Sequence, residues 1–109
     1  MKKIINGKRY DTKTAVRIGH YDNIGEGADS QSDFCWWAAN LYRTPRSGQY
    51  FLAGEGGPMS RFSRPAGQNA LSGGEGLTPL SDADAMAWAE QYLDAEVVEA
   101  EFADVIEDA

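Results

Sequence analysis

The chain has 109 residues, of which 42% are hydrophobic and 25% charged, and its formal net charge at pH 7 is −7. This length suffices for one modest hydrophobic core, and the apolar content is too high for a disordered chain, so we expect a single domain over residues 1–109. No apolar run approaches the roughly 20 residues needed to span a bilayer, which argues against a membrane protein and favours a cytoplasmic one.

The charges are unevenly distributed along the chain. All ten Lys and Arg residues lie within residues 2–64 together with six acids, whereas residues 65–109 hold eleven acids and no Lys or Arg. The first part therefore carries a net charge of +4 and the second part a net charge of −11. Because the second part would repel phosphates, we expect no direct binding of nucleic acid through it.

A β-hairpin is the first predicted element. Its turn is the Asn-Gly pair between residues 3–5 and residues 8–10, a pair typical of tight hairpins. A short helix capped by Asp11 or Thr12 is then expected to run to about Ile18, because small and apolar side chains recur there at a spacing of three.

A second hairpin is predicted from residues 34–43 and 49–53, which are rich in strand-forming residues and are joined by a turn at residues 45–48. Alternation gives the first of these strands two apolar faces. We therefore expect it to be central in a sheet, with at least one of Trp36 and Trp37 in the core.

A shorter strand is expected around residues 59–62, followed by a glycine-rich connection over residues 64–76. Ser81 and the acid three residues after it then resemble a capping box that opens a helix to about Leu93, with Trp88 on its buried side. A second helix should begin at Asp94 or Ala95. Its apolar stripe comprises Val98, Phe102, Val105 and Ile106. Together the elements predict an α+β fold, in which an antiparallel sheet of three to five strands packs against short N-terminal and acidic C-terminal helices.

The residue types that support catalysis or metal binding are sparse. His20 is the single histidine and is expected at the surface near a helix end, and the single cysteine, Cys35, is expected to be a small core residue. Asp82, Asp84 and Glu90 lack the spacing of a calcium-binding loop. The glycine clusters at 54–57 and 73–76 lack the spacing that holds phosphate, so turns and close backbone packing explain them better. We expect neither an enzyme nor a metal or other cofactor.

The candidate functional residues are the acids of the two predicted C-terminal helices. Neighbours three or four apart on a helix are about 5–6 Å from each other at Cβ, so one broad negative surface is expected. Its candidate partner-binding residues are Asp82, Asp84, Glu90, Asp94, Glu96, Glu99, Glu101 and Asp104, and Glu107 and Asp108 of the last predicted helix lie on the same surface. The surface could simply keep the protein soluble, or it could occupy a positively charged groove by imitating DNA, which carries one negative charge per ~1.7 Å of helix axis.

Several segments resemble a family of small acidic proteins of bacterial mobile elements. They are MKKIINGKRYDT at residues 1–12, LYRT at 41–44, YFL at 50–52, GEGG at 54–57 and PLS at 79–81. The resemblance spans most of the chain and its motifs are structural, so it implies no catalytic residues. Some small acidic proteins of this kind are anti-CRISPR inhibitors, and the chain has some likeness to inhibitors of type I surveillance complexes.

The sequence and the resemblance together lead to two hypotheses. In the first, the protein is a stoichiometric inhibitor in the bacterial host cytoplasm, and its acidic surface competes with target DNA for the basic groove of a type I CRISPR surveillance complex. In the second, it is a non-enzymatic protein-interaction module of a mobile element that does not imitate DNA.

Overall fold

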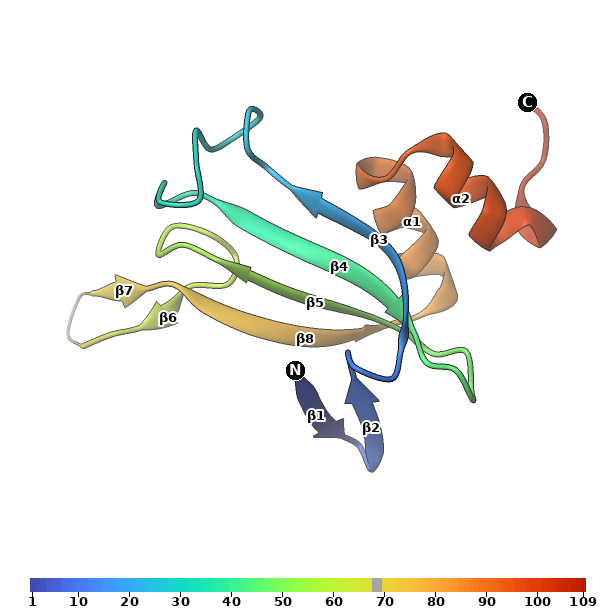
Figure 1. Cartoon of the computed structure of the whole chain (residues 1–109), viewed down its shortest axis with the longest axis horizontal. Helices are drawn as coiled ribbons and strands as arrows, with labels where there is room; N and C mark the ends of the chain where they lie inside the picture. Colours follow the sequence, from blue (N-terminus) through green and yellow to red (C-terminus); the bar gives the residue numbers. More distant parts are fainter. Residues whose placement is uncertain (68–69) are drawn as a thin grey trace.

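The computed structural model describes residues 1–67 and 70–109 as an α+β fold, with a four-stranded antiparallel sheet, a separate N-terminal hairpin and two C-terminal helices (Figure 1). The strands are β1 (Lys2–Ile5), β2 (Lys8–Asp11), β3 (Val16–Asp22), β4 (Trp37–Arg43), β5 (Tyr50–Gly56), β6 (Arg64–Pro65), β7 (Leu71–Ser72) and β8 (Gly74–Leu80). The helices are α1 (Asp82–Tyr92), α2 (Ala95–Phe102) and the 3-10 turn η1 (Ala103–Val105). The predicted fold class is confirmed. Two residues of the expected glycine-rich connection, 68 and 69, lie outside the described residues.

The main sheet has the strand order β3-β4-β5-β8. β4 and β5 form the predicted hairpin, with Leu41 opposite Leu52, and β4 is central as expected. The strand starts at Trp37 rather than at residue 34, because the Asp33 side chain accepts the Cys35 amide at 2.9 Å and its carbonyl accepts the next amide in a turn. This turn uses backbone groups that a longer strand would need for pairing.

The larger hydrophobic core lies between the sheet and the two helices. Its buried residues are Ala39, Leu41, Tyr50, Leu52, Ala85, Trp88, Ala89, Val98 and Phe102. Trp88 is 8% exposed, which confirms its predicted burial. Trp37 is partly buried and packs against the same core, with its ring centroid 5.3 Å from those of Tyr21 and Tyr92, so the expectation of a core tryptophan among Trp36 and Trp37 is only partly met.

The predicted N-terminal hairpin is confirmed, and it covers part of the opposite face of the sheet. Asn6 and Gly7 form the turn with positive φ angles of 52° and 77°, as an Asn-Gly hairpin turn requires. Tyr10 of this hairpin packs edge-on against Phe51 at a centroid distance of 5.4 Å. A smaller core of Tyr10, Phe51 and Leu77 results.

The predicted helix to Ile18 is wrong, because this segment forms a turn and then strand β3. The Ala15 amide donates to the Asp11 carbonyl in one isolated turn, after which residues 16–22 pair with β4. The spacing of apolar residues fits a short helix, but the β-branched Val16 and Ile18 favour a strand. Pairing with β4 also provides hydrogen-bond partners for the backbone amides and carbonyls on the outer edge of β4. His20 therefore lies on a strand, not at a helix end.

The strand expected at residues 59–62 is also wrong. These residues form successive turns, in which the Ser60 side chain donates to the Gly57 carbonyl at 2.7 Å and the Ser63 amide donates to the Ser60 carbonyl. The fourth strand of the sheet is instead β8, which begins in the segment expected to be a connection and extends to Leu80. The two glycine clusters pair there, with Gly54 opposite Gly76 and Glu55 opposite Glu75. Close backbone packing is present, but in strands rather than turns.

The two C-terminal helices are confirmed. The Asp84 amide donates to the Ser81 side chain at 3.1 Å, which fixes the start of α1, and Asp94 is the N-cap residue of α2. The apolar stripe is only partly correct. Val105 and Ile106 are 64% and 38% exposed, because α2 ends at Phe102 and the tighter 3-10 turn changes the direction in which later side chains project. Within residues 1–67 and 70–109, no helix has the length and apolar character needed to cross a membrane.

Candidate binding surface

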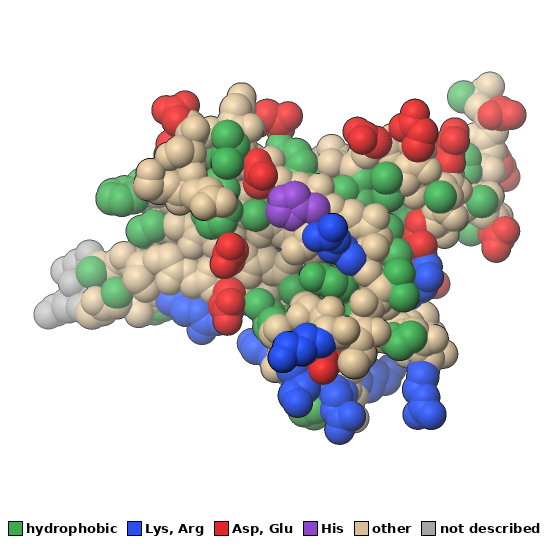
Figure 2. Space-filling model, in the orientation of Figure 1, with side chains coloured by type: hydrophobic (Ala, Val, Ile, Leu, Met, Phe, Trp, Pro, Cys, Tyr) green, Lys and Arg blue, Asp and Glu red, His purple; other side chains and the backbone are tan. Residues whose placement is uncertain are grey.

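The acids of α1, of α2 with its N-cap residue Asp94, and of the C-terminal tail (residues 103–109, including η1) form an exposed surface, which we call the acidic helical face. Its exposed members are Asp82, Asp84, Glu90, Asp94, Glu96, Glu99, Asp104, Glu107 and Asp108. Figure 2 shows Asp and Glu side chains gathered along the edge of the molecule formed by α2 and the tail. The segment after residue 64 contains no Lys or Arg to offset these charges.

Local sequence explains why some of these acids lie where they do. Asp82 and Asp84 are in the first turn of α1, and Glu96 is in the first turn of α2, where a carboxylate interacts favourably with the positive end of the helix dipole. Neither helix has a basic residue in its last turn. The helices therefore stabilise acids at their starts and leave the negative charge of their ends uncompensated.

The fold brings several predicted site residues together across the helix pair. Glu90 of α1 and Glu99 of α2 border one cleft, and Asp82 and Asp104 border a second. Glu96 lies beside β3, at a third hollow that also contains Arg17.

Glu101 is the exception, since the structure removes it from the exposed surface. Its side chain is 12% exposed, and one carboxylate oxygen accepts hydrogen bonds from Arg43 and from the Tyr50 hydroxyl, the latter at 2.6 Å. Burial, reinforced by the bond to Glu101, raises the pKa of Tyr50 to about 12. The bond to Glu101 also raises the pKa of the Arg43 guanidinium. The placement of Glu101 on the binding surface is corrected accordingly, because this residue ties α2 to β4 and β5.

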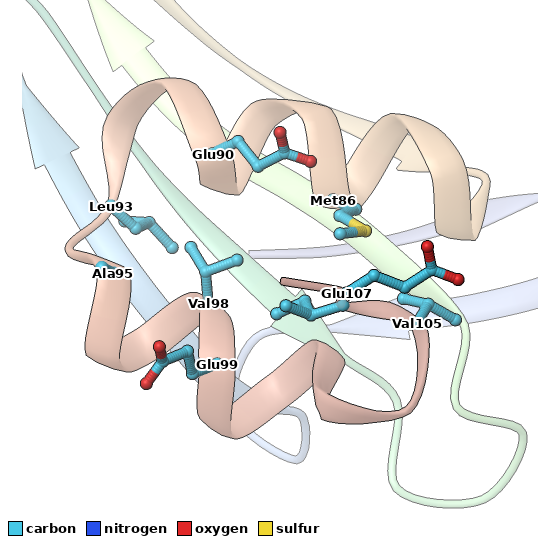
Figure 3. Close-up of a pocket in the computed structure, with 9 residues that line it drawn as sticks. Met86, Glu90, Leu93, Ala95, Val98, Glu99, Val105 and Glu107 are labelled. Atoms are coloured by element: carbon cyan, nitrogen blue, oxygen red, sulfur yellow. The ribbon is translucent and has the colours of Figure 1, made fainter. Parts of the chain in front are cut away.

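The cleft between α1 and α2 combines acidic and apolar side chains, and its apolar part is a feature that the sequence prediction missed. It has a volume of about 570 Å³. Figure 3 shows Met86 and Glu90 projecting from α1, Leu93 and Val98 pointing toward each other, and Val105 and Glu107 entering from the tail. The sequence signal is the pair Val105-Ile106, which the sequence places on the apolar stripe of the second predicted helix. In the structure these residues line the cleft and remain exposed.

The opposite pole of the molecule is basic. Five exposed cations lie on or beside the N-terminal hairpin, which we call the basic hairpin: Lys2, Lys3, Lys8, Arg9 and Lys13. Figure 2 shows Lys and Arg side chains gathered at this end, away from the acids of α2. The charge asymmetry of the sequence is therefore also a separation in space.

The part of the sheet that the hairpin leaves uncovered carries the histidine. His20 Nδ1 and Asn40 Oδ1 are 2.8 Å apart, and the nearest carboxylate oxygen of Asp22 is 3.6 Å from Nε2. Glu55 and Glu75 lie at the same shallow hollow of about 220 Å³. Across the described parts of the chain, no three or more His, Cys, Asp or Glu residues are grouped to hold a metal ion.

Comparison of the chain with protein-family models, with curated proteins and with solved structures gave no significant match.

Proposed function

We propose that this protein is a non-enzymatic inhibitor that binds a protein complex through its acidic helical face and competes there with DNA. The expected partner is the basic groove of a bacterial type I CRISPR surveillance complex, as the sequence resemblance implies. The observation that carries the proposal is the group of nine exposed carboxylates on α1, α2 and the tail, in a segment without any Lys or Arg.

The charge density of this face is what makes competition with DNA physically reasonable. A groove that binds DNA holds cations spaced for a closely charged polyanion, and exposed carboxylates at helical spacing of about 5–6 Å offer such cations an alternative. Like charges three or four residues apart also repel each other and lower the stability of the helix. Cations of a partner would relieve this repulsion on binding.

Binding is favoured over catalysis by the surroundings of the histidine. Nucleophilic catalysis pairs a base with a hydroxyl or thiol and an orienting group. The Nδ1 atom of His20 lies 2.8 Å from the amide oxygen of Asn40, and its Nε2 atom lies 3.6 Å from a carboxylate oxygen of Asp22, so both of these partners are oxygen acceptors and neither is a hydroxyl or thiol. This arrangement supports a structural polar contact rather than an activated nucleophile.

The second candidate function, a protein-interaction module that does not imitate DNA, is favoured by a different observation. The cleft between α1 and α2 has apolar walls that include Met86 and Val98, in addition to its glutamates. A phosphate backbone has no counterpart to such a surface. A partner that binds this apolar surface would make contacts that DNA cannot offer.

A gel-shift assay with a purified type I surveillance complex tests the first function. Saturating amounts of the protein should prevent the complex from shifting its target duplex, and the protein alone should not shift that duplex. A variant with Glu96→Lys, Glu99→Lys and Asp104→Lys should lose this effect, because all three side chains are exposed and Glu101 is left in place. Its circular dichroism and melting should match those of the unmodified protein.

The matched control reverses three charges at the other pole, with Lys2→Glu, Lys3→Glu and Lys8→Glu. This variant has the same number of substitutions on exposed sites, and it should still inhibit. Inhibition that survives the reversals on α2, or target binding that is unaffected by the unmodified protein, would exclude competition through the acidic helical face.

A further inference from the structure

The cleft between α1 and α2 has a chemical character that charge alone does not explain. Its lining contains six apolar residues: Met86, Leu93, Ala95, Val98, Val105 and Ile106. The remaining lining residues are the exposed Glu90, Glu99 and Glu107. We propose that this cleft is the docking site for a basic amphipathic helix of the partner protein, an inference that rests on the proposed function in taking the partner to be a basic protein.

The exposure of the tail residues supports an apolar contact. Val105 is 64% exposed and Ile106 is 38% exposed, although both line the same cleft as the partly buried Met86 and Leu93. Apolar side chains gathered at one concave site and rimmed by polar groups are typical of an interaction surface, unlike apolar residues scattered singly. A partner that covers them removes their apolar area from water, which favours binding.

The walls of the cleft decide what kind of segment it can hold. α1 and α2 satisfy most of their backbone amides and carbonyls internally, so they offer no strand edge to an extended peptide. An occupant must therefore satisfy its own backbone hydrogen bonds. A helix does so, and its side chains at positions i, i+3, i+4 and i+7 form the apolar stripe that a groove between two helices accepts.

The three glutamates specify the charge of that helix. Figure 3 shows Glu90 and Glu107 extending from different sides of the space between the helices, while Glu99 projects from α2. Lys or Arg residues flanking the apolar stripe of an occupant would meet them, and the segment supplies no cation of its own. Charge complementarity and apolar burial thus point to the same occupant.

The test uses the full chain and a synthetic amphipathic peptide of leucine and lysine with leucine at helical spacing. In a nuclear magnetic resonance titration, the peptide should shift the signals of Met86, Leu93, Val98, Val105 and Ile106. A peptide of the same composition in scrambled order should have an affinity lower by about tenfold or more, because it cannot present a continuous apolar stripe. Equal binding of the two peptides, or shifts spread evenly over all acidic residues, would overturn the proposal.

A pair of variants separates the cleft from the charge. Val105→Ser with Ile106→Ser keeps every carboxylate and should weaken peptide binding about tenfold, whereas the control Val16→Ser with Ile24→Ser, at exposed apolar sites elsewhere, should not. Unchanged affinity of the first variant would overturn the inference. A second result would also overturn it. If the unmodified protein self-associates in sedimentation experiments at rising concentration and the Val105→Ser, Ile106→Ser variant does not, the cleft holds a second copy of the chain.

The two proposals can fail separately. If the serine variant of the tail blocks the surveillance complex as well as the unmodified protein does, the docking site is wrong and the competition with DNA stands. If the unmodified protein leaves the complex unaffected but binds the peptide in the cleft, the proposed inhibitor function is wrong and the docking site stands.

Discussion

At the scale of single residues, Glu101 shows how a charge can serve stability rather than recognition. It lies three residues after the buried Val98 and next to the buried Phe102, so it borders the buried side of α2. Its cation, Arg43, is 58 residues away in sequence. Helical spacing indicates a position beside the core, but the sequence has no signal for a partner on a different element.

Replacing Glu101 with alanine should lower the free energy of unfolding by about 2 kcal/mol. The buried Tyr50 hydroxyl would lose its acceptor, whereas Arg43, with 35% of its side chain exposed, could turn toward water, so the loss falls short of that for a fully buried pair. Urea unfolding followed by tryptophan fluorescence measures it. The control is Glu99→Ala, an exposed acid on the same helix, which should change stability by less than about 0.5 kcal/mol. Equal effects at the two sites would contradict this role of Glu101.

The two shifted tyrosines predict a loss of stability at high pH. A hydrogen bond to Glu26 raises the pKa of Tyr21 to about 12, and burial raises that of Tyr50 to about 12, against an ordinary value of 10.0. Between pH 10 and 12 the folded chain holds protons that the unfolded chain releases, so the free energy of unfolding falls as pH rises through this window. Below pH 10 both tyrosines are protonated in the folded and the unfolded chain, so they do not make the free energy of unfolding depend on pH. Urea midpoints measured across the window should fall less steeply for Tyr50→Phe. An identical slope in this variant would exclude Tyr50 as a source.

At the scale of elements, the segments that the sequence predicted best are those with a local chemical signal. The Asn-Gly turn located the first hairpin, and the Ser81 cap located α1. β8 has no such signal, because its glycines show no apolar alternation. Its strand conformation depends on pairing with β5, and β3 likewise depends on pairing with β4. Both are long-range effects that local propensity does not encode.

The facing glycines Gly54 and Gly76 allow a matched test of this sheet. A Cβ atom at Gly54 would lie 2.5 Å from the Phe62 ring and 2.7 Å from the Ala38 carbonyl, whereas one at Gly76 would be 3.7 Å from its nearest neighbour. Gly54→Ala should therefore destabilise the protein by about 1–3 kcal/mol through overpacking. Gly76→Ala should be neutral or slightly stabilising, because alanine restricts the unfolded chain. Thermal melts of the two variants measure the difference. Equal melting temperatures would contradict the packing of Phe62 on β5.

At the scale of the whole molecule, the sequence predicted the charge asymmetry but not its arrangement in space. The count of acids after residue 64 indicated an anionic part, and helical spacing indicated an exposed face, which is where nine carboxylates lie. The apolar cleft was not predictable, because it depends on where α2 ends and on the direction that the tail takes through and after η1. Apolar spacing alone places Val105 and Ile106 in the core.

The separation of the basic hairpin from the acidic helical face gives the molecule a large electric dipole. The molecule measures 48 by 36 Å in the plane of Figure 2, whereas charges in physiological salt are screened over about 8 Å. Each pole should therefore act on its surroundings almost independently of the net charge. In a buffer whose salt keeps the screening length well below the size of the molecule, both anion-exchange and cation-exchange resins should retain the protein, in opposite orientations. Near a cationic groove, the same dipole would rotate the protein helix-first before contact, so that a larger fraction of collisions is productive.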